Sequence, residues 1–453
     1  MMGINYRRVH LIGAGGAGMS AIAKVLAGMG HVVSGSDLRG GSTLDRLADF
    51  GITTYTGHHP EAARSADLVV ASSAVPNHDP ELVAATEAGV PLWRRPELLA
   101  ALTAGIPTVG ATGTHGKTTT TALLISALQA AGEDPSFIVG GDLADWNTNG
   151  HFGSTDLLVV EADEAFRTFE SLHLIGLVIT NVEAEHLEHF GTEDDLAASF
   201  VKVARSVAGP VVACADDPGA LAVAREVGAI TYGLDAGSDW RIVDLVPSNG
   251  GIDFDLVGPA GTTRVSLNRP GAHVARNAAG VLALTSAMGR DIEASVRGLA
   301  SFRGVGRRWE NRGTVSGVTL IDDYAHHPTE VAATLAAASG IVPGRLWAVF
   351  QPHLYSRTQR FQQEFGTALS QADEVVVTDV YGSREEPVPG VTGRLVADAA
   401  RSHGASVHYV PHMVDLAQFL AERVEEGDLV LTMGAGDITL VPTELALRLA
   451  ESQ

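Results

Sequence analysis

The sequence predicts an α/β fold with three domains, each built on a mostly parallel β-sheet. Short apolar runs alternate along the chain with helical patterns of ten or more residues. Strands arranged in this way form parallel sheets that helices cover on both faces. The length of 453 residues also exceeds what one hydrophobic core usually serves. We therefore expect three consecutive α/β domains.

The first domain is expected at residues 1–106 and to be Rossmann-like. A glycine-rich turn follows its first strand and opens a helix. Prolines punctuate the passage before Gly105-Ile106-Pro107, where we place the boundary. The predicted strands lie at 8–12, 31–35 and 68–72, and the predicted helix at 19–30.

The central domain, 107–311, is expected to be an ATPase-like domain that begins with a P-loop. Its predicted elements are strands at 157–160, 177–180 and 211–214, a β-rich tract at 240–267 and a helix at 277–288. The third domain, 312–453, alternates most regularly and is expected to be Rossmann-like. Its predicted elements are strands at 318–322, 346–350, 374–378, 406–410 and 429–432, with helices at 329–338 and 415–425.

The composition of the chain excludes several classes of protein. The net charge of −22 argues against a nucleic-acid or anionic-membrane binder, because both need a basic surface. The single cysteine, Cys214, excludes an internal disulfide and suits a reducing cytoplasm. No signal-peptide pattern is present at the N-terminus, and no apolar run approaches the ~20 residues of a membrane span. We expect a cytoplasmic protein.

Residues 111–118 have the spacing of a P-loop, with Ala111 in place of the first glycine. Glycines let backbone N–H groups close around phosphate oxygens, and the helix N-terminus adds positive potential. Lys117 would reach the terminal phosphates, and the Thr118 hydroxyl would ligate Mg²⁺. The chain has only three lysines, which makes coincidence less plausible. The alternative is a Gly/Thr-rich turn that opens an ordinary helix.

The turn Gly13–Gly18 resembles a dinucleotide-binding fingerprint. It follows a strand, and Asp37 ends the next strand nineteen residues after Gly18, where an acidic residue contacts a ribose hydroxyl. The fingerprint leaves NAD(P) and a UDP-sugar equally open, since each presents a diphosphate beside a ribose. The alternative is a tight turn without a ligand.

Acidic and imidazole side chains follow two predicted strands of the central domain. Glu161 comes directly after one strand and His186 lies beyond the end of the next. A carboxylate and an imidazole beside phosphate oxygens can hold a divalent cation that keeps several waters. The alternative is a solvated acidic loop.

Two strand ends of the third domain carry histidine and arginine. One is Asp322-Asp323-Tyr324-Ala325-His326-His327, and the other runs from His353 to Arg357. Ligands of open α/β sheets bind at such ends, so a cleft is expected there. Helix capping and exposed arginines are the alternative.

In their order along the chain, these motifs resemble those of the Mur ligases of peptidoglycan synthesis. His115 before Gly116-Lys117, together with Asp-Asp-Tyr-x-His-His-Pro from Asp322, is characteristic of the alanine-adding branch and its tripeptide-recycling relative. The segments that carry the resemblance are 13–20, 34–37, 113–121, 161–164, 302–308, 322–330, 350–353 and 434–436.

The resemblance implies one domain each for UDP-N-acetylmuramate, ATP and the amino acid, here L-alanine. It favours the UDP-sugar over NAD at the Gly13 turn. It also implies attack of the sugar's lactyl carboxylate on the γ-phosphate of ATP, with Mg²⁺ present. The resulting acyl phosphate is then attacked by the amine of the amino acid.

The resemblance also implies roles for individual residues. UDP-sugar binding falls to Gly15, Gly16, Ala17, Gly18, Met19, Ser20, Ser36 and Asp37. ATP binding falls to Gly113, Thr114, Gly116, Lys117, Thr118, Thr119, Asn277, Arg308 and Asp323. The implied metal ligands are Thr118, Glu161 and His186, and the implied amino-acid site consists of Tyr324, His326 and Arg357. The implied catalytic residues are Lys117, His186, His326 and Arg357.

Some positions depart from the family pattern. Ala165-Phe166 replaces Ser-Asp, Glu185 replaces Asp, Val274 replaces Asn and Leu354 replaces Arg. Lys202 does not align with the carbamylated lysine of sister ligases, and we assign it no role. A ligase for another amino acid or a recycled peptide, a nicotinamide-dependent oxidoreductase and a non-catalytic nucleotide-binding regulator remain alternatives. A monomer or a homodimer is expected.

Overall fold

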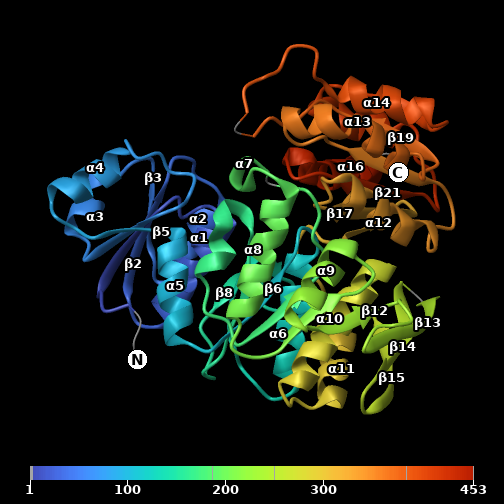
Figure 1. Ribbon diagram of the computed structural model, residues 1–453. Coiled ribbons are helices and arrows are strands. Elements are labelled where there is room, and N and C mark those ends of the chain that lie inside the picture. The colour runs from blue at the N-terminus through green and yellow to red at the C-terminus, as the bar shows by residue number, and fades with distance from the viewer. Residues whose placement is uncertain (1–3, 186, 249, 384, 452–453) are drawn as a thin grey trace. The chain divides into compact units, whose positions relative to one another are not determined.

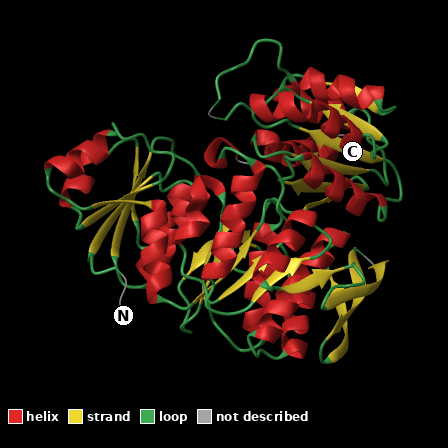
Figure 2. Cartoon of the chain, in the orientation of Figure 1, coloured by secondary structure: helices red, strands yellow, loops and turns green. Residues whose placement is uncertain are grey.

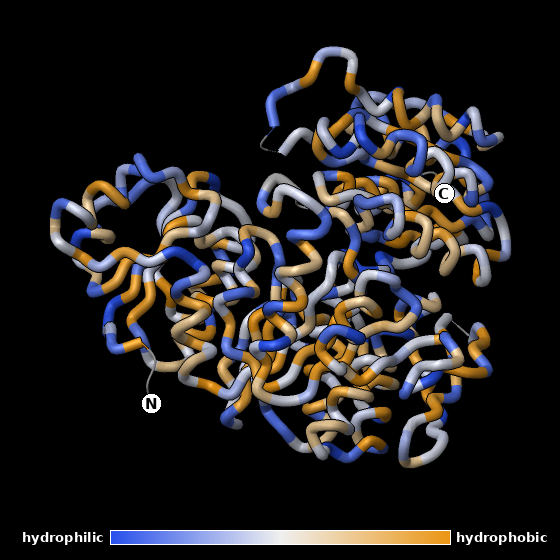
Figure 3. The backbone as a smooth tube through the Cα atoms, viewed as in Figure 1, coloured by the Kyte–Doolittle hydropathy of each residue, from blue (hydrophilic) through white to orange (hydrophobic). Residues whose placement is uncertain are grey.

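The computed structural model describes residues 4–185, 187–248, 250–383 and 385–451, and it has an α/β fold with three β-sheets (Figures 1 and 2). The chain forms two compact units. The first comprises 1–245, 254–267 and 275–303, and the second 246–253, 268–274 and 304–453. Hydrophobic residues concentrate along the central strands (Figure 3). None of the helices in the described ranges is long and apolar enough to cross a bilayer.

The first sheet is parallel and has the strand order β3-β2-β1-β4-β5. The order reverses between β1 and β4, so the turn after β1 lies at the switch point where such sheets bind ligands. The strands are β1 Arg8–Ile12, β2 Val32–Asp37, β3 Thr53–Thr56, β4 Leu68–Ala71 and β5 Leu92–Arg94. The helices are α1 Ala17–Gly28, α2 Ser42–Arg46, η1 Leu47–Phe50, α3 Pro60–Ser65, α4 Pro80–Glu87 and α5 Arg95–Gly105.

The second sheet has ten strands in the order β15-β14-β13-β12-β11-β10-β6-β9-β7-β8. From β7 to β13 through β6 the neighbours pair in parallel, whereas β8 is antiparallel to β7. Its strands are β6 Thr108–Thr112, β7 Ser136–Leu143, β8 Thr148–His151, β9 Leu158–Glu161, β10 Gly176–Ile179, β11 Val211–Cys214, β12 Ile230–Gly233, β13 Trp240–Ser248, β14 Gly251–Gly258 and β15 Gly261–Leu267. The helices are α6 Lys117–Ala130, η2 Ala165–Ser171, α7 Leu187–Phe190, α8 Glu193–Ser206, α9 Pro218–Val227, α10 Ala272–Ala287 and α11 Ile292–Ser301.

The third sheet has the order β16-β17-β21-β18-β19-β20 and is parallel except for β16. Separate apolar clusters cover its two faces, one with α12, α13 and α14 and the other with α15 and α16. The strands are β16 Glu310–Val315, β17 Val318–Asp323, β18 Leu346–Phe350, β19 Glu374–Val377, β20 Ser406–Tyr409 and β21 Leu429–Met433. The helices are α12 Pro328–Ser339, α13 Tyr355–Leu369, α14 Gly393–Ser402, α15 Met413–Ala421, η3 Asp437–Leu440 and α16 Val441–Glu451.

The predicted α/β class is confirmed, but some predicted element bounds are wrong. The helix expected at 277–288 begins five residues earlier, at Ala272. The helix expected at 415–425 ends at Ala421, because the N–H groups of Arg423 and Val424 both donate to the Leu420 carbonyl in a turn. Residue 311, our predicted domain boundary, lies inside β16.

Candidate active site

The P-loop lies at the carboxyl end of β6, in the interior of the second sheet. β6 pairs with β9 on one side and with β10 on the other, so residues after those strands flank the loop. Glu161 ends β9, as expected. His186, expected on the other side, lies outside the described residues. The two flanking strands are not neighbours of each other, since β6 separates them.

The glycines of the loop are required by its backbone. Gly113 and Gly116 have positive φ values of 133° and 82°, which disfavour other residues. A Cβ on Gly113 would also overlap the Thr180 hydroxyl. Gly116 is the N-cap of α6 and provides no side-chain cap for the N–H groups of the first turn. That turn, which begins with Lys117, Thr118 and Thr119, is therefore suited to phosphate oxygens.

Asn181, the second residue after β10, holds the P-loop in place. The side-chain oxygen of Asn181 accepts a hydrogen bond from the His115 N–H at 2.8 Å, and its backbone oxygen accepts one from the Thr114 N–H at 3.1 Å. No local sequence pattern indicates this role, because the contact joins residues 66 positions apart.

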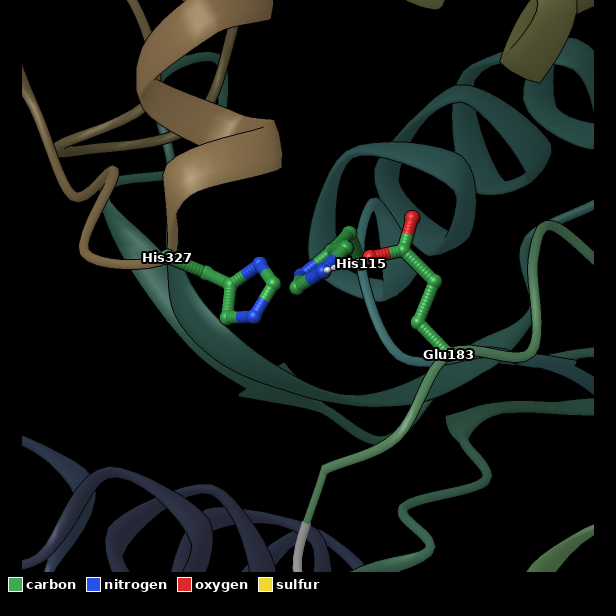
Figure 4. A group of neighbouring side chains, drawn as sticks. All are labelled: His115, Glu183 and His327. Carbon is green, nitrogen blue, oxygen red and sulfur yellow. Dashed lines mark ion pairs between the residues drawn. The ribbon is translucent and has the colours of Figure 1, made fainter. Parts of the chain in front are cut away.

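His115, which helps to distinguish the family branch, faces an acidic partner from the same segment as Asn181. Its Nε2 lies 3.5 Å from Oε2 of Glu183, and Figure 4 draws this ion pair as a dashed line. The backbone N–H of Glu183 donates to the Thr114 hydroxyl at 2.8 Å. The segment after β10 thus holds the P-loop through both side-chain and backbone contacts.

Lys117 points back onto its own loop and to a buried carboxylate. Its Nζ donates to the Gly113 carbonyl at 2.7 Å, to the Thr114 carbonyl at 3.1 Å and to Oε1 of Glu164 at 2.8 Å. Burial by itself lowers the pKa of Lys117, but the negative charges of Glu164 and Asp163 outweigh it and raise this pKa. Lys117 is therefore cationic. The sequence analysis assigned no role to Glu164, although the residue lies within the family-like segment 161–164.

Glu161 and Thr118, two predicted metal ligands, are hydrogen-bonded to each other. Oε1 of Glu161 also accepts the Gly140 N–H at 2.8 Å. Burial raises the pKa of Glu161, and the two hydrogen bonds only partly oppose this shift. A half-buried carboxylate beside a hydroxyl fits Mg²⁺, which binds a few protein oxygens and retains waters.

Asn277, the predicted adenine contact, lies on α10 beside the P-loop. It is buried, and its amide would be 3.3 Å from a Cβ placed on Gly116. Phe166, which stands where the family pattern has Asp, is 46% exposed and has a positive φ of 55°. Its ring centroid lies 4.5 Å from that of His189, which is half-buried.

The glycine turn after β1 is held by β2. The N–H groups of Gly13 and Ala14 donate to the Ser36 carbonyl, and the Gly15 N–H donates to Oδ2 of Asp37 at 3.0 Å. Asp37 therefore shapes the turn in addition to any contact with a ribose. The Ser36 hydroxyl donates to the buried Glu81 at 2.6 Å.

The predicted UDP-sugar residues differ in their exposure to solvent. Gly16 and Ala17 are exposed, and Gly15 and Gly18 are partly exposed. The side chains of Met19 and Ser20 are buried, and the Ser20 hydroxyl donates to the Ala17 carbonyl. The accessible part of the motif is therefore backbone, which suits a diphosphate.

In the second unit, Tyr324 lies between cationic and imidazole groups. The guanidinium groups of Arg307 and Arg308 lie 4.8 Å and 5.0 Å from its ring centroid. The ring of His326 lies edge-on to it at 5.2 Å. Nδ1 of His326 is 2.9 Å from the Tyr324 carbonyl and 3.2 Å from the Glu330 carboxylate.

Histidines that follow β17 and β18 lie close together. The rings of His326 and His353 are 5.7 Å apart, and Nδ1 of His353 lies 3.1 Å from Nη1 of Arg357. The predicted amino-acid residues are thus brought together at one edge of the third sheet. His327, also labelled in Figure 4, is the N-cap of α12.

Asp323, a predicted nucleotide contact, has a structural role here. Its carboxylate accepts the Trp309 N–H at 2.7 Å and the Ala325 N–H at 2.8 Å. Burial raises its pKa to about 6, although the positive charge of Arg308 opposes the shift. Arg307 donates to the carbonyls of Gly434 and Gly436, a bracing role that the sequence did not reveal.

Three family models together match most of the chain. They are the "Mur ligase family, catalytic domain" at residues 8–106, the "Mur ligase middle domain" at 111–285 and the "Mur ligase, glutamate ligase domain" at 307–436.

Curated relatives and a solved structure match over nearly the full length. UDP-N-acetylmuramate–L-alanine ligase of Kineococcus radiotolerans is 46% identical, with 98% of this chain and 96% of that protein covered. The ligase of the same name from Saccharopolyspora erythraea is 45% identical, with 97% and 92% covered. The crystal structure of UDP-N-acetylmuramate-alanine ligase from Thermotoga maritima superposes with a TM-score of 0.86 at 28% identity, covering 98% of this chain and all of that chain.

Proposed function

The chain belongs to the Mur ligase family, and from this premise we propose that it joins L-alanine to UDP-N-acetylmuramate in an ATP-dependent reaction. The observation that carries the proposal is the 46% identity to a ligase of that name over 98% of the chain. The family matches do not support the oxidoreductase alternative.

In the proposed reaction, the lactyl carboxylate of the UDP-sugar attacks the γ-phosphorus of ATP and ADP leaves. The amine of L-alanine then attacks the acyl phosphate carbon, an amide forms, and inorganic phosphate leaves with loss of a proton from the amine. Two negative groups must meet in the first step, so cationic groups must offset their charge.

The P-loop region supports the first step. Cationic Lys117 is placed to move from Glu164 to the γ-phosphate, and the uncapped first turn of α6 offers N–H groups to the other phosphates. Thr118 and Glu161 would hold Mg²⁺, together with His186, which lies outside the described residues. The bound cation would neutralise phosphate charge.

The edge of the third sheet supports amino-acid binding. Tyr324, His326 and Arg357 offer a hydroxyl, an imidazole and a guanidinium within one cluster, and a guanidinium suits the carboxylate of an amino acid. These roles are part of the proposal.

Phosphate release from the purified chain tests the proposal. Reactions contain ATP, Mg²⁺ and UDP-N-acetylmuramate with L-alanine, glycine, L-serine or the recycled tripeptide. We expect the highest kcat/KM with L-alanine. Release that does not depend on the UDP-sugar would rule out the ligase, and preference for another amine would select the alternative within the family.

A further inference from the structure

A cavity of about 130 Å³ lies in the first unit between the two predicted substrate regions. Its lining includes Gly18, Arg95, Gly140, Glu161 and Asp163. Gly18 belongs to the predicted UDP-sugar turn and Glu161 to the predicted metal site. At about 30 Å³ per water, the cavity accommodates a carboxylate or phosphate with part of a sugar, but not a whole nucleotide sugar.

Two glycines keep this cavity open. A Cβ on Gly18 would lie 3.0 Å from Cζ and 3.1 Å from Nη1 of Arg95. A Cβ on Gly140 would lie 2.9 Å from Oε2 of Glu161. The guanidinium and the carboxylate therefore pack directly against backbone that carries no side chain.

Arg95, the first residue of α5, has unused hydrogen-bonding capacity. Its Nε is buried and has no hydrogen-bond partner among the residues that the structure describes. Among the described residues of the lining, which include the carboxylates Glu161 and Asp163, Arg95 is the only cationic side chain. Among the described side chains of the lining, Arg95 is therefore the one that can offset the charge of an anionic group, in addition to any cation held at Glu161. A planar guanidinium can bind a carboxylate or a phosphate with two parallel hydrogen bonds.

We propose that Arg95 binds an oxyanion of the UDP-sugar, either its diphosphate or its lactyl carboxylate, beside Gly18. This inference rests on the proposed function and adds a substrate-binding residue that the family motifs did not indicate. The guanidinium fixes the sugar end of the substrate between the glycine turn and the carboxylate of Glu161.

Calorimetric titration of wild type, Arg95→Met and Arg95→Lys tests the proposal. The probes are UDP-N-acetylmuramate, UDP-N-acetylglucosamine, which lacks the lactyl carboxylate, and UMP, which lacks the second phosphate. We expect Arg95→Met to raise the Kd of UDP-N-acetylmuramate about 10- to 100-fold, as for a lost charge-assisted contact, and Arg95→Lys to restore part of it. Exposed Arg64 on α3 provides the matched control, since Arg64→Met removes the same charge and should leave the Kd unchanged.

The probes separate the two oxyanions. If Arg95 binds the carboxylate, Arg95→Met leaves binding of UDP-N-acetylglucosamine unchanged. If it binds the diphosphate, Arg95→Met raises the Kd of both UDP-sugars equally and leaves the Kd of UMP unchanged. Unchanged Kd values for both UDP-sugars overturn the proposal.

A measurement on the wild type does not depend on how well the variants fold. UDP-N-acetylmuramate should protect Arg95 from phenylglyoxal, as followed by peptide mass spectrometry, and undiminished modification at saturating UDP-sugar overturns the proposal. Failure of the proposed function is distinct, because the wild type would then bind no UDP-sugar or release no phosphate.

Discussion

The ammonium group of Lys117 is bound to Glu164 and to two carbonyls of its own loop. In the proposed reaction it exchanges these partners for the γ-phosphate of ATP. Glu164 then keeps Lys117 charged and oriented until ATP arrives. The chain offers a matched control, because Lys202 is exposed and lies on α8 outside the P-loop.

We expect Lys117→Ala to lower kcat at least a hundredfold, since it removes a cation from the transferring phosphate. Lys202→Ala should retain kcat within about twofold. Initial rates of phosphate release measure both, and thermal unfolding checks that each variant is folded. A Lys117→Ala enzyme with near wild-type turnover would contradict the assignment.

Among the elements, η2 and α8 are joined through the half-buried Glu170. Its carboxylate accepts hydrogen bonds from Ser199 and Lys202 on α8 and from Arg167 within η2. Burial raises the pKa of Glu170, but these three contacts outweigh it and lower the pKa to about 2. Because the folded-state pKa lies below the unfolded value, this stabilisation is present above about pH 4.5 and is lost as the pH falls toward 2.

Glu170→Gln should therefore destabilise the protein at pH 7 more than at acidic pH. Between pH 7 and pH 3.5 we expect the difference in unfolding free energy between wild type and variant to shrink by roughly 1 kcal/mol. Urea unfolding at both pH values measures it. A difference that does not vary with pH would show that the Glu170 charge contributes nothing.

Helix α1 packs closely on β8 because both elements carry glycine at the contact. A Cβ on Gly150 would overlap the backbone of Ala21, and a Cβ on Gly28 would lie 2.5 Å from Cβ of Phe152, the residue that follows β8. Nearby, the buried Lys24 donates to Thr148 and Asn149 at 3.0 Å and 2.8 Å. These contacts position the helix that follows the predicted UDP-sugar turn.

Gly150→Ala should destabilise the protein by about 1–3 kcal/mol, because neither backbone can move far without disturbing this contact. Gly340 provides the control, since it has an ordinary φ of −83° and open space around its Cα. Gly340→Ala should change stability by less than about 0.5 kcal/mol. Urea unfolding of the two variants compares them directly, and equal stabilities would contradict the packing argument.

At the scale of the whole molecule, a chain with a net charge of −22 is proposed to bind two anionic substrates. Its overall field opposes their approach, so local groups must supply the attraction. N–H groups of the P-loop, Lys117, Arg95 and a divalent cation are the candidates on the first unit.

Removal of divalent cations with EDTA should abolish phosphate release, and added Mg²⁺ should restore it, because the carboxylate and the γ-phosphate repel each other without a cation. Binding of UMP, which needs no metal at Glu161 in this scheme, should persist in EDTA. Calorimetry and the phosphate assay measure the two effects, and undiminished turnover without divalent ions would contradict the metal assignment.

Apolar periodicity located the central parallel strands to within a residue or two, as for Arg8–Ile12 and Leu346–Phe350. It missed β7, β8 and β16, in which glycines and polar residues leave no apolar run longer than three residues. β7 and β8 are largely buried and β16 is largely exposed. All three depend on pairing and packing with neighbouring elements, so their own sequence carries a weak signal.

The sequence by itself determined the α/β class, the family and the P-loop, because local spacing of glycine, lysine and threonine suffices for a phosphate loop. Only the tertiary structure decided which side chains support these motifs. Asn181 at the P-loop, Glu164 beside Lys117 and Arg95 against Gly18 are contacts between residues 47 to 77 positions apart. Such contacts follow from the order of strands in a sheet and from close packing, which no local pattern encodes.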